Sequence, residues 1–129
     1  MDATIEFLRG KIFTSIYEED ASRLIFENDE WKCTFMHHQD CCEYVYIESI
    51  VGDLNDLVDS TMLIAEEVTN ECDYPILSDE QLELQKEQES FTWTFYKFAT
   101  KKGYVDVRWF GASNGYYSEG VDFSVVKKT

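Results

Sequence analysis

The stretch MHHQDCCEYVYIE gathers, within residues 37–43, most of the side-chain types that bind metal ions or act as nucleophiles. His37 lies four residues before Cys41, Cys42 follows directly, and an acidic residue stands on each side of the cysteine pair. Imidazole and thiolate are good ligands for zinc, which is a borderline-soft ion. His37, Cys41 and Cys42 are therefore a candidate zinc site, with the flanking carboxylates as further ligands.

The same residues also fit a purely structural role, which we favour. Familiar structural zinc sites use C-x2-C pairs, and adjacent cysteines in an extended chain point apart. A disulfide between neighbours would be strained, so we expect reduced thiols. Because cysteine is among the most often buried residue types, Cys41 and Cys42 are expected to pack beneath a turn. A Cys–His nucleophile is disfavoured, because acidic surroundings oppose a thiolate.

Two acidic groups elsewhere offer oxygen ligands of the kind that Mg²⁺ and Ca²⁺ prefer. Glu66 and Glu67 are adjacent, and Asp53 and Asp56 lie three residues apart in DLNDLVDS. However, neighbours on a strand point to opposite faces. The second stretch also lacks the glycine and the terminal glutamate of an EF-hand loop. We interpret these residues as a solvated or partner-facing surface.

The stretch RWFGASNGYYSE is the strongest candidate for a recognition surface. Five polar and aromatic side chains are expected near its Asn-Gly turn: Arg108, Asn114, Tyr116, Tyr117 and Glu119. Tyrosine and arginine are enriched where proteins contact partners, and aromatic rings also stack on nucleobases. The alternative is ordinary turn chemistry combined with buried tyrosines. We expect contact function here if the chain has one.

Composition narrows the class of protein. The 129 residues are enough for one domain, over 1–129, and the net charge is −15 with 16% aromatic residues. Such a charge repels nucleic acid and anionic membranes and favours a basic protein partner. The sequence is also compatible with a homo-oligomer. No apolar run reaches the roughly 20 residues of a membrane span. The start, MDATIEFLRG, does not resemble a signal peptide, so we expect a cytoplasmic protein.

Periodicity and turn signals predict an α+β domain dominated by antiparallel sheet. We expect a strongly curved or barrel-like sheet of six to seven strands with one or two short helices. Trp31, Cys33, Phe35 and His37 alternate, so they should share a strand face. An exposed acidic loop or surface helix is expected over 70–90, where Ser78 and Gln81 have the spacing of a capping box. The predicted helices are 2–10 and 52–58, and the predicted strands are 11–17, 24–26, 31–37, 44–52, 61–69, 90–100, 103–111 and 121–126.

Several of these stretches together resemble an uncharacterised family of small bacteriophage and prophage proteins. The shared pattern is H-x-x-D-C-C-E-x-V-x-I-E-x-I-x-G-D-L, then A-E-E-V, W-T-F-Y and R-W-[YF]-G-x-S-N-G-Y-Y-S-E. The resemblance covers nearly the whole chain and implies a phage source, but no reaction. The residues that carry it are His37, Asp40, Cys41, Cys42, Glu43, Glu48, Gly52, Asp53, Glu66, Glu67, Trp93, Tyr96, Arg108, Trp109, Gly111, Ser113, Asn114, Gly115, Tyr116, Tyr117 and Glu119.

These observations predict a binding protein rather than an enzyme, with no cofactor unless zinc is bound. Our first hypothesis is a small acidic phage protein that inhibits a basic host defence protein, such as a CRISPR effector or restriction enzyme. Its carboxylates would mimic the phosphates of DNA. The alternatives are a module that sequesters a nucleotide with Arg108 and the nearby tyrosines, and a metal protein at His37, Cys41 and Cys42.

Overall fold

The computed structural model describes residues 4–69, 78–86 and 89–128, which contain eight strands and three short helices. The strands of one sheet are β1 (Ser15–Glu19), β2 (Arg23–Glu27), β3 (Trp31–Met36) and β8 (Asp122–Lys127). Those of the other are β4 (Tyr44–Val51), β5 (Ile64–Thr69), β6 (Ser90–Thr100) and β7 (Gly103–Ser113). The helices are the 3-10 turns η1 (Ile5–Leu8) and η2 (Leu54–Leu57) and the α-helix α1 (Asp79–Lys86).

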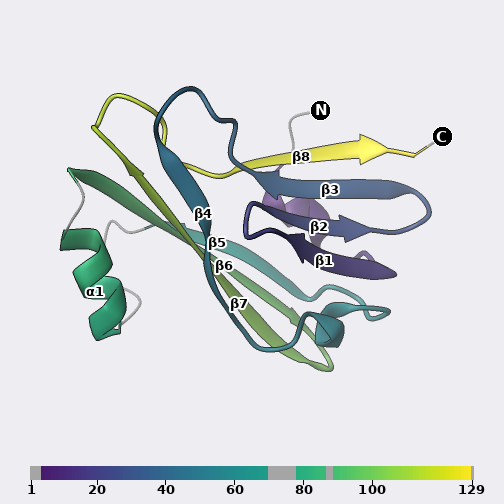
Figure 1. The fold of residues 1–129 in the computed structure, drawn as a ribbon. Coiled ribbons are helices and arrows are strands. Elements are labelled where there is room, and N and C mark those ends of the chain that lie inside the picture. The colour runs from purple at the N-terminus through teal and green to yellow at the C-terminus, as the bar shows by residue number, and fades with distance from the viewer. Residues whose placement is uncertain (1–3, 70–77, 87–88, 129) are drawn as a thin grey trace.

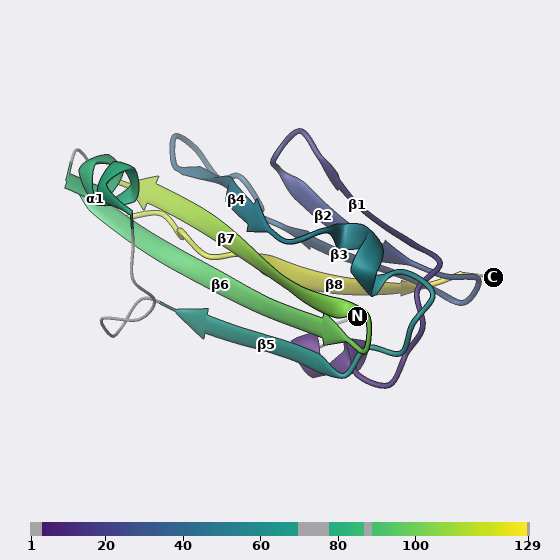
Figure 2. The ribbon, with the colours of Figure 1, turned by 90° about the horizontal axis from the view of Figure 1, so that it is seen from below.

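The strands form two four-stranded antiparallel sheets that pack face to face. The strand order is β1-β2-β3-β8 in the first sheet and β4-β7-β6-β5 in the second. Figures 1 and 2 show the two layers, with the strands of the second sheet running obliquely to those of the first. This arrangement is a β-sandwich, in which each sheet contributes one face to a shared interior.

The predominance of antiparallel strands is confirmed, but the predicted single barrel-like sheet of six to seven strands is wrong. The Asn-Gly turn after β7 does not return the chain to β7. The chain crosses instead to the first sheet, where β8 pairs with β3 in register from Trp31↔Lys127 to Met36↔Asp122. Because the last strand joins the N-terminal hairpin, the strands separate into two sheets and no barrel closes.

Aromatic side chains from both sheets fill the space between the layers. Phe26 on β2 lies 5.0 Å from Phe98 on β6, and Phe35 on β3 lies 4.7 Å from Tyr96, measured between ring centroids. Trp109 on β7 is buried in the same cluster. The alternation predicted for β3 is confirmed, because Cys33, Phe35 and His37 all point inward. Each buried ring removes a large apolar area from water, which makes this cluster the main source of stability.

A second aromatic cluster lies on the outer face of the second sheet, under α1. It consists of Trp93, Phe95, Phe110 and Ala112, with Leu84 of α1 packed against it. The predicted capping box begins this helix: the backbone N–H of Gln81 donates to Ser78 Oγ, and that of Ser78 donates to Gln81 Oε1. Within 70–90, where an exposed acidic loop or surface helix is expected, the structure has an α-helix over Asp79–Lys86, while residues 70–77 and 87–88 lie outside the described chain.

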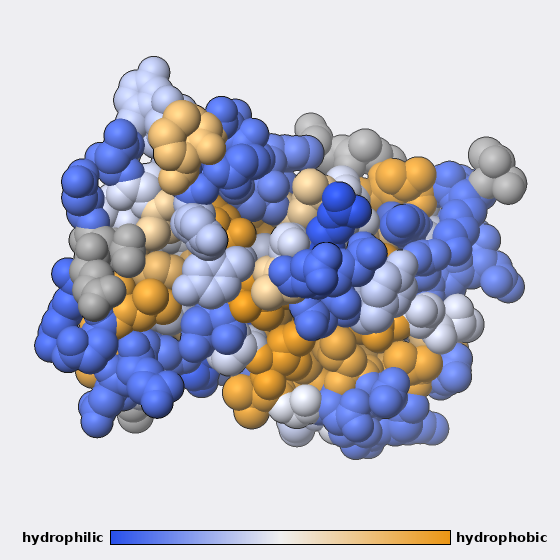
Figure 3. Space-filling model, in the orientation of Figure 1, coloured by the Kyte–Doolittle hydropathy of each residue, from blue (hydrophilic) through white to orange (hydrophobic). Residues whose placement is uncertain are grey.

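No helix in the described part of the chain is long and apolar enough to cross a bilayer. Hydrophilic residues cover most of the face shown in Figure 3, and an apolar area lies in its lower half, over the region between β1 and η2.

Candidate functional site

Two loops that carry the most distinctive sequence patterns meet at one end of the sandwich. One is the β3–β4 loop (37–43), and the other is the β7–β8 loop (114–121). His37 joins them: its Nδ1 lies 2.7 Å from the carbonyl oxygen of Gly120, and its Nε2 lies 2.8 Å from Glu43 Oε2. The imidazole is buried between the loops, so it fixes their relative position.

The hydrogen bonds around Glu43 define the charge state of this pair. The backbone N–H groups of Asp40 and Cys41 donate to its two carboxylate oxygens at 2.8 Å each. Burial raises the pKa of Glu43, but the Asp40 N–H, the His37 ring and the Cys41 N–H outweigh it and hold this pKa at about 2. The Gly120 carbonyl can only accept. Both ring nitrogens of His37 therefore donate, and the pair is a buried imidazolium–carboxylate ion pair.

The cysteine pair differs from our prediction in two respects. Cys41 and Cys42 are joined to each other by a disulfide, and both are exposed instead of packed beneath the turn. The residue that does behave as a core cysteine is Cys33, whose thiol pKa is raised to about 12 by burial. The backbone explains the exposure of the pair, because the loop turns its amide N–H groups inward toward Glu43 and its side chains outward.

This arrangement gives the zinc hypothesis no support. Both nitrogens of His37 face oxygen acceptors, and the sulfurs of Cys41 and Cys42 are bonded to each other. Within residues 4–69, 78–86 and 89–128, no three histidine, cysteine or acidic side chains are grouped so that they could hold a metal ion.

Glu119 shapes the β7–β8 loop from within. Its carboxylate accepts from Thr92 Oγ at 2.8 Å and from Ser113 Oγ at 2.5 Å. The Ser113 hydroxyl in turn accepts the backbone N–H of Gly115, and the side chain of Asn114 accepts that of Tyr116. The predicted turn chemistry of Asn114 is thus present, and Glu119 bonds within the loop and to β6.

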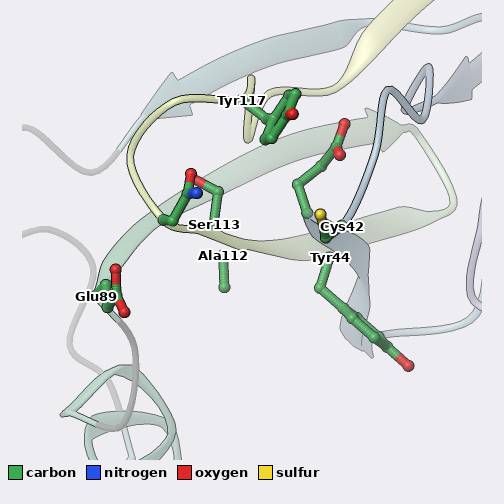
Figure 4. A pocket seen from close by; sticks show the side chains of 8 residues that line it. Cys42, Tyr44, Glu89, Ala112, Ser113 and Tyr117 are labelled. Atoms are coloured by element: carbon green, nitrogen blue, oxygen red, sulfur yellow. The ribbon is translucent and has the colours of Figure 1, made fainter.

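The internal bonds of the loop leave its tyrosines at the surface. Tyr116 is 82% exposed and packs edge-on against the half-buried ring of Tyr117, with 4.9 Å between ring centroids. An open cavity of about 340 Å³ lies between Tyr117 and the β3–β4 loop, lined among others by Cys42, Glu89, Ala112 and Ser113. In Figure 4 the ring of Tyr44, at the start of β4, points away from this cavity. Both distinctive patterns of the sequence therefore contribute walls to one cavity.

Arg108 does not lie with these tyrosines. It stands on the outer face of the second sheet, where Nη1 donates to Gln81 Oε1 of α1 at 3.4 Å and the guanidinium lies 6.0 Å from the ring centroid of Phe95. The expectation that it gathers near the Asn-Gly turn is wrong. Arg108 lies five residues before Ser113, the end of the extended strand β7, which places it roughly 17 Å from the start of that turn.

The other predicted acidic residues are also dispersed. Glu66 and Glu67 lie on β5, and Glu67 accepts a hydrogen bond from the hydroxyl of Tyr96 at 3.1 Å. Asp53 caps η2 by accepting from the backbone N–H of Asn55, as the sequence indicated. Asp56 follows within η2. None of these four carboxylates joins the two loops at the cavity.

Charge is unevenly distributed along the sandwich. We use the name loop end for the side of the molecule formed by residues 18–23, 37–43, 78–86, 89 and 113–122. In Figure 1 the loops at 37–43 and 113–122 lie at the upper left and α1 lies at the lower left. The β1–β2 turn lies nearer the middle, where the backbone N–H of Ile47 donates to the carbonyl oxygen of Ala21. Its acidic residues are Glu18, Glu19, Asp20, Asp40, Glu43, Asp79, Glu80, Glu83, Glu89, Glu119 and Asp122. Arg23 and Lys86 are the only lysine or arginine residues in these segments, and Arg23 pairs with Glu19 at 3.8 Å.

The opposite end of the sandwich mixes both signs of charge. Its segments are 9–14, 27–32, 52–63, 100–104 and 126–128. Backbone hydrogen bonds tie most of them together, and the hydroxyl of Thr100 donates to the carbonyl oxygen of Asp56. The acidic residues there are Glu27, Asp29, Glu30, Asp53, Asp56 and Asp59, and the basic ones are Arg9, Lys11, Lys32, Lys101, Lys102, Lys127 and Lys128. Within the residues that the structure describes, negative charge is therefore concentrated at the loop end, which the order of residues alone does not reveal.

Comparison with known proteins places these features in a family. No curated protein and no solved structure matches the chain. A family defined by its shared sequence, and described as Domain of unknown function (DUF7448), matches residues 6–123, which include both loops of the cavity. The chain belongs to this family of domains of unknown function.

Proposed function

We propose that this protein acts by binding, and that its loop end docks onto a basic protein. The observation that carries the proposal is the segregation of charge: in the described segments, the loop end combines its many carboxylates with two basic residues, Arg23 and Lys86. Opposite charges steer two proteins together and favour basic surfaces over acidic ones. A basic groove that normally holds nucleic acid is the surface that such carboxylates complement best.

The way the loops are built supports binding rather than catalysis. The side chains that a catalytic site would use, His37 and Glu43, are already hydrogen-bonded in the contact that joins the two loops. What the loop end presents to solvent is a rigid frame with exposed tyrosines. Rigid aromatic side chains lose little entropy on binding, and they are enriched among the residues that dominate binding energy.

The partner class follows from this charge together with the phage-like sequence pattern. A small acidic protein made by a phage would benefit from occupying the nucleic-acid groove of a host defence protein, such as a CRISPR effector or restriction enzyme. The nucleotide-binding alternative receives less support, because the structure separates Arg108 from Tyr116 and Tyr117. A pocket that uses all three side chains is not formed.

Capture of partners from host lysate, treated with nuclease, tests the proposal. We expect immobilised protein to retain basic proteins at low salt and to release them at high salt, because exposed charges are screened within about 10 Å at 0.1 M salt. The variant E18Q/E19Q/D20N should retain less. The matched variant D53N/D56N/D59N removes the same charge from the opposite end and should retain as much as the unaltered protein. Equal loss in both variants, or no basic protein at low salt, would refute the proposal.

A further inference from the structure

We infer that the cavity between the two loops is a receptor for the guanidinium group of an arginine side chain, supplied by the basic partner. This inference rests on the proposed function and names the group that the loop end recognises. It is drawn from the chemistry of the walls, from the charge around them and from the way the loops are held in place.

The walls offer one aromatic face and an apolar side. The ring of Tyr117 borders the cavity and is supported edge-on by Tyr116. Cys42, whose sulfur is bonded to Cys41, and the methyl group of Ala112 contribute apolar surface. A guanidinium group is planar and weakly hydrated, so it stacks on an aromatic ring while its apolar stem lies along such a surface.

The charge around the cavity selects a cation. Glu89, which is exposed at its edge, supplies a carboxylate that can receive a bidentate pair of hydrogen bonds from a guanidinium. Glu43 is already neutralised by His37, and Lys86 pairs with Glu83 at 3.4 Å. Among the residues that the structure describes, no lysine or arginine lines the cavity. An anionic ligand would therefore meet carboxylates without a compensating cation.

The cavity is preformed by bonds that a ligand does not have to create. His37 holds the β3–β4 loop against Gly120, and Glu119 holds Ser113 next to Thr92. Its volume of about 340 Å³ lies at the small end of the range of ligand pockets, about 300–1,000 Å³, which suits a single side chain. A site that is already shaped loses less entropy when it is filled.

Titration with capped tripeptides, followed by two-dimensional NMR, tests the inference. A Gly-Arg-Gly peptide should shift the amide signals of Ser113 and Tyr117 in a saturable way at millimolar concentrations. The same peptide with citrulline, which keeps the shape but lacks the charge, should shift them at least about threefold less at equal concentration. The Gly-Lys-Gly peptide should fall between the two, because lysine has charge without the planar group. Equal shifts with arginine and citrulline would overturn the inference.

Variants separate the cavity from the general charge of the loop end. Glu89→Gln and Tyr117→Leu should each weaken binding of the arginine peptide at least about threefold. Tyr104→Leu is the control, because Tyr104 is 74% exposed at the start of β7, about 30 Å away along the strand. Unchanged amide signals elsewhere in the spectrum establish that each variant is folded. Glu89 is exposed, so its variant tests the inference even if replacement of Tyr117 disturbs the loop.

The two proposals fail in different ways. If the arginine peptide binds but no basic protein is captured at low salt, the proposed partner is wrong and the cavity assignment stands. If basic proteins are captured and E89Q and Y117L leave both the peptide titration and the capture unchanged, docking is by surface charge and the cavity assignment is wrong.

Discussion

At the scale of single residues, His37 and Glu43 show that side chains able to do chemistry can have a purely structural role. A buried ion pair costs free energy to desolvate, and it persists only when its remaining hydrogen-bonding groups are satisfied. Here the Gly120 carbonyl satisfies the second ring nitrogen, and two backbone N–H groups satisfy the carboxylate. The pair therefore belongs to the frame of the two loops, and removal of either partner would leave a buried charge without its counterion.

Low pH should destabilise the contact between the two loops over a defined pH interval. The pKa of Glu43 is about 2 in the folded protein, below its ordinary value of 4.5. The ionised carboxylate therefore contributes stability that is complete above about pH 4.5 and is lost as the pH falls toward 2. Urea unfolding at pH 7, 4.5 and 3 should show a free energy of unfolding that changes little between pH 7 and 4.5 and falls clearly by pH 3. Glu43→Gln should start lower at pH 7 and decline less steeply.

Other carboxylates keep some of the acid dependence in that variant. The pKa of Glu27 is also lowered, chiefly by its hydrogen bonds from Lys128 and Tyr17, so a residual slope is expected. Glu6→Gln, at an exposed position on η1, is the control and should retain the slope of the unaltered protein. An identical slope in the Glu43 variant and the unaltered protein would contradict the ion-pair assignment.

The cysteines should differ sharply in reactivity. Cys33 is buried, and burial raises its thiol pKa to about 12, so alkylation at pH 8 should leave it unmodified until the protein is unfolded. Cys41 and Cys42 are exposed and disulfide-bonded, so they should react only after a dithiol reductant is added. Mass spectrometry of proteolytic fragments assigns each label. Labelling of Cys41 or Cys42 in the native protein without reductant would refute the disulfide.

The sequence identified the residues of this loop better than it identified their structural roles. Alternation along 31–37 correctly placed Cys33 and His37 on the inner face of a strand. The double cysteine was assigned to the interior because cysteine is commonly buried, yet the bonding of Glu43 to the loop amides turns both side chains outward. The partner of His37 across the molecule is a backbone carbonyl, at Gly120, and no side-chain pattern could have indicated it.

At the scale of elements, the β7–β8 loop depends on a close passage over the end of β7. A Cβ atom placed on Gly111 would lie 2.3 Å from the carbonyl oxygen of Glu119. The loop can therefore cross the strand only where a side chain is missing. Its own polar bonds, from Glu119 to Thr92 and Ser113, then hold it in place.

Gly111→Ala should consequently displace the loop and destabilise the protein by roughly 1–3 kcal/mol, because a backbone oxygen cannot move away as a flexible side chain can. Thermal unfolding and the amide signals of 113–120 provide the measurements. Gly120→Ala is a suitable control: the nearest atom to its Cβ would be Ser118 Oγ at 3.7 Å, an ordinary contact. Similar losses in both variants would show that close passage at Gly111 is not the cause.

Local signals predicted the elements well where the bonds that form them are local. Ser78 with Gln81, and Asp53 at the start of the predicted helix 52–58, each bond within three residues of themselves. An Asn-Gly pair such as 114–115 commonly joins two paired strands, but a turn fixes the direction of the chain for a few residues only, and here the chain leaves β7 for the other sheet. The choice of β3 as partner for β8 depends on contacts more than 80 residues apart, which no local pattern encodes.

At the scale of the whole molecule, β8 is the strand that completes the sandwich. It joins the C-terminal part of the chain to the N-terminal hairpin, and the loop before it builds the cavity wall. The same crossover places the acidic loop segments together and leaves most lysines at the other end. Neither the two-sheet architecture nor the charge segregation could be predicted from composition, since both depend on this long-range pairing.

If β8 closes the sandwich in this way, adjacent valines on it should differ in their contribution to the stability of the whole molecule. Val125 is 2% exposed and pairs with Cys33, whereas Val126 is 59% exposed on the opposite face. Val125→Ala should lower the free energy of unfolding by about 2 kcal/mol, because it removes two buried methyl groups and leaves a small cavity. Val126→Ala should change it by less than about 0.5 kcal/mol. Urea unfolding followed by tryptophan fluorescence measures both, and a single cooperative transition should persist in each variant, because one core joins the two sheets. Equal effects of the two substitutions would mean that β8 does not present this face to the core.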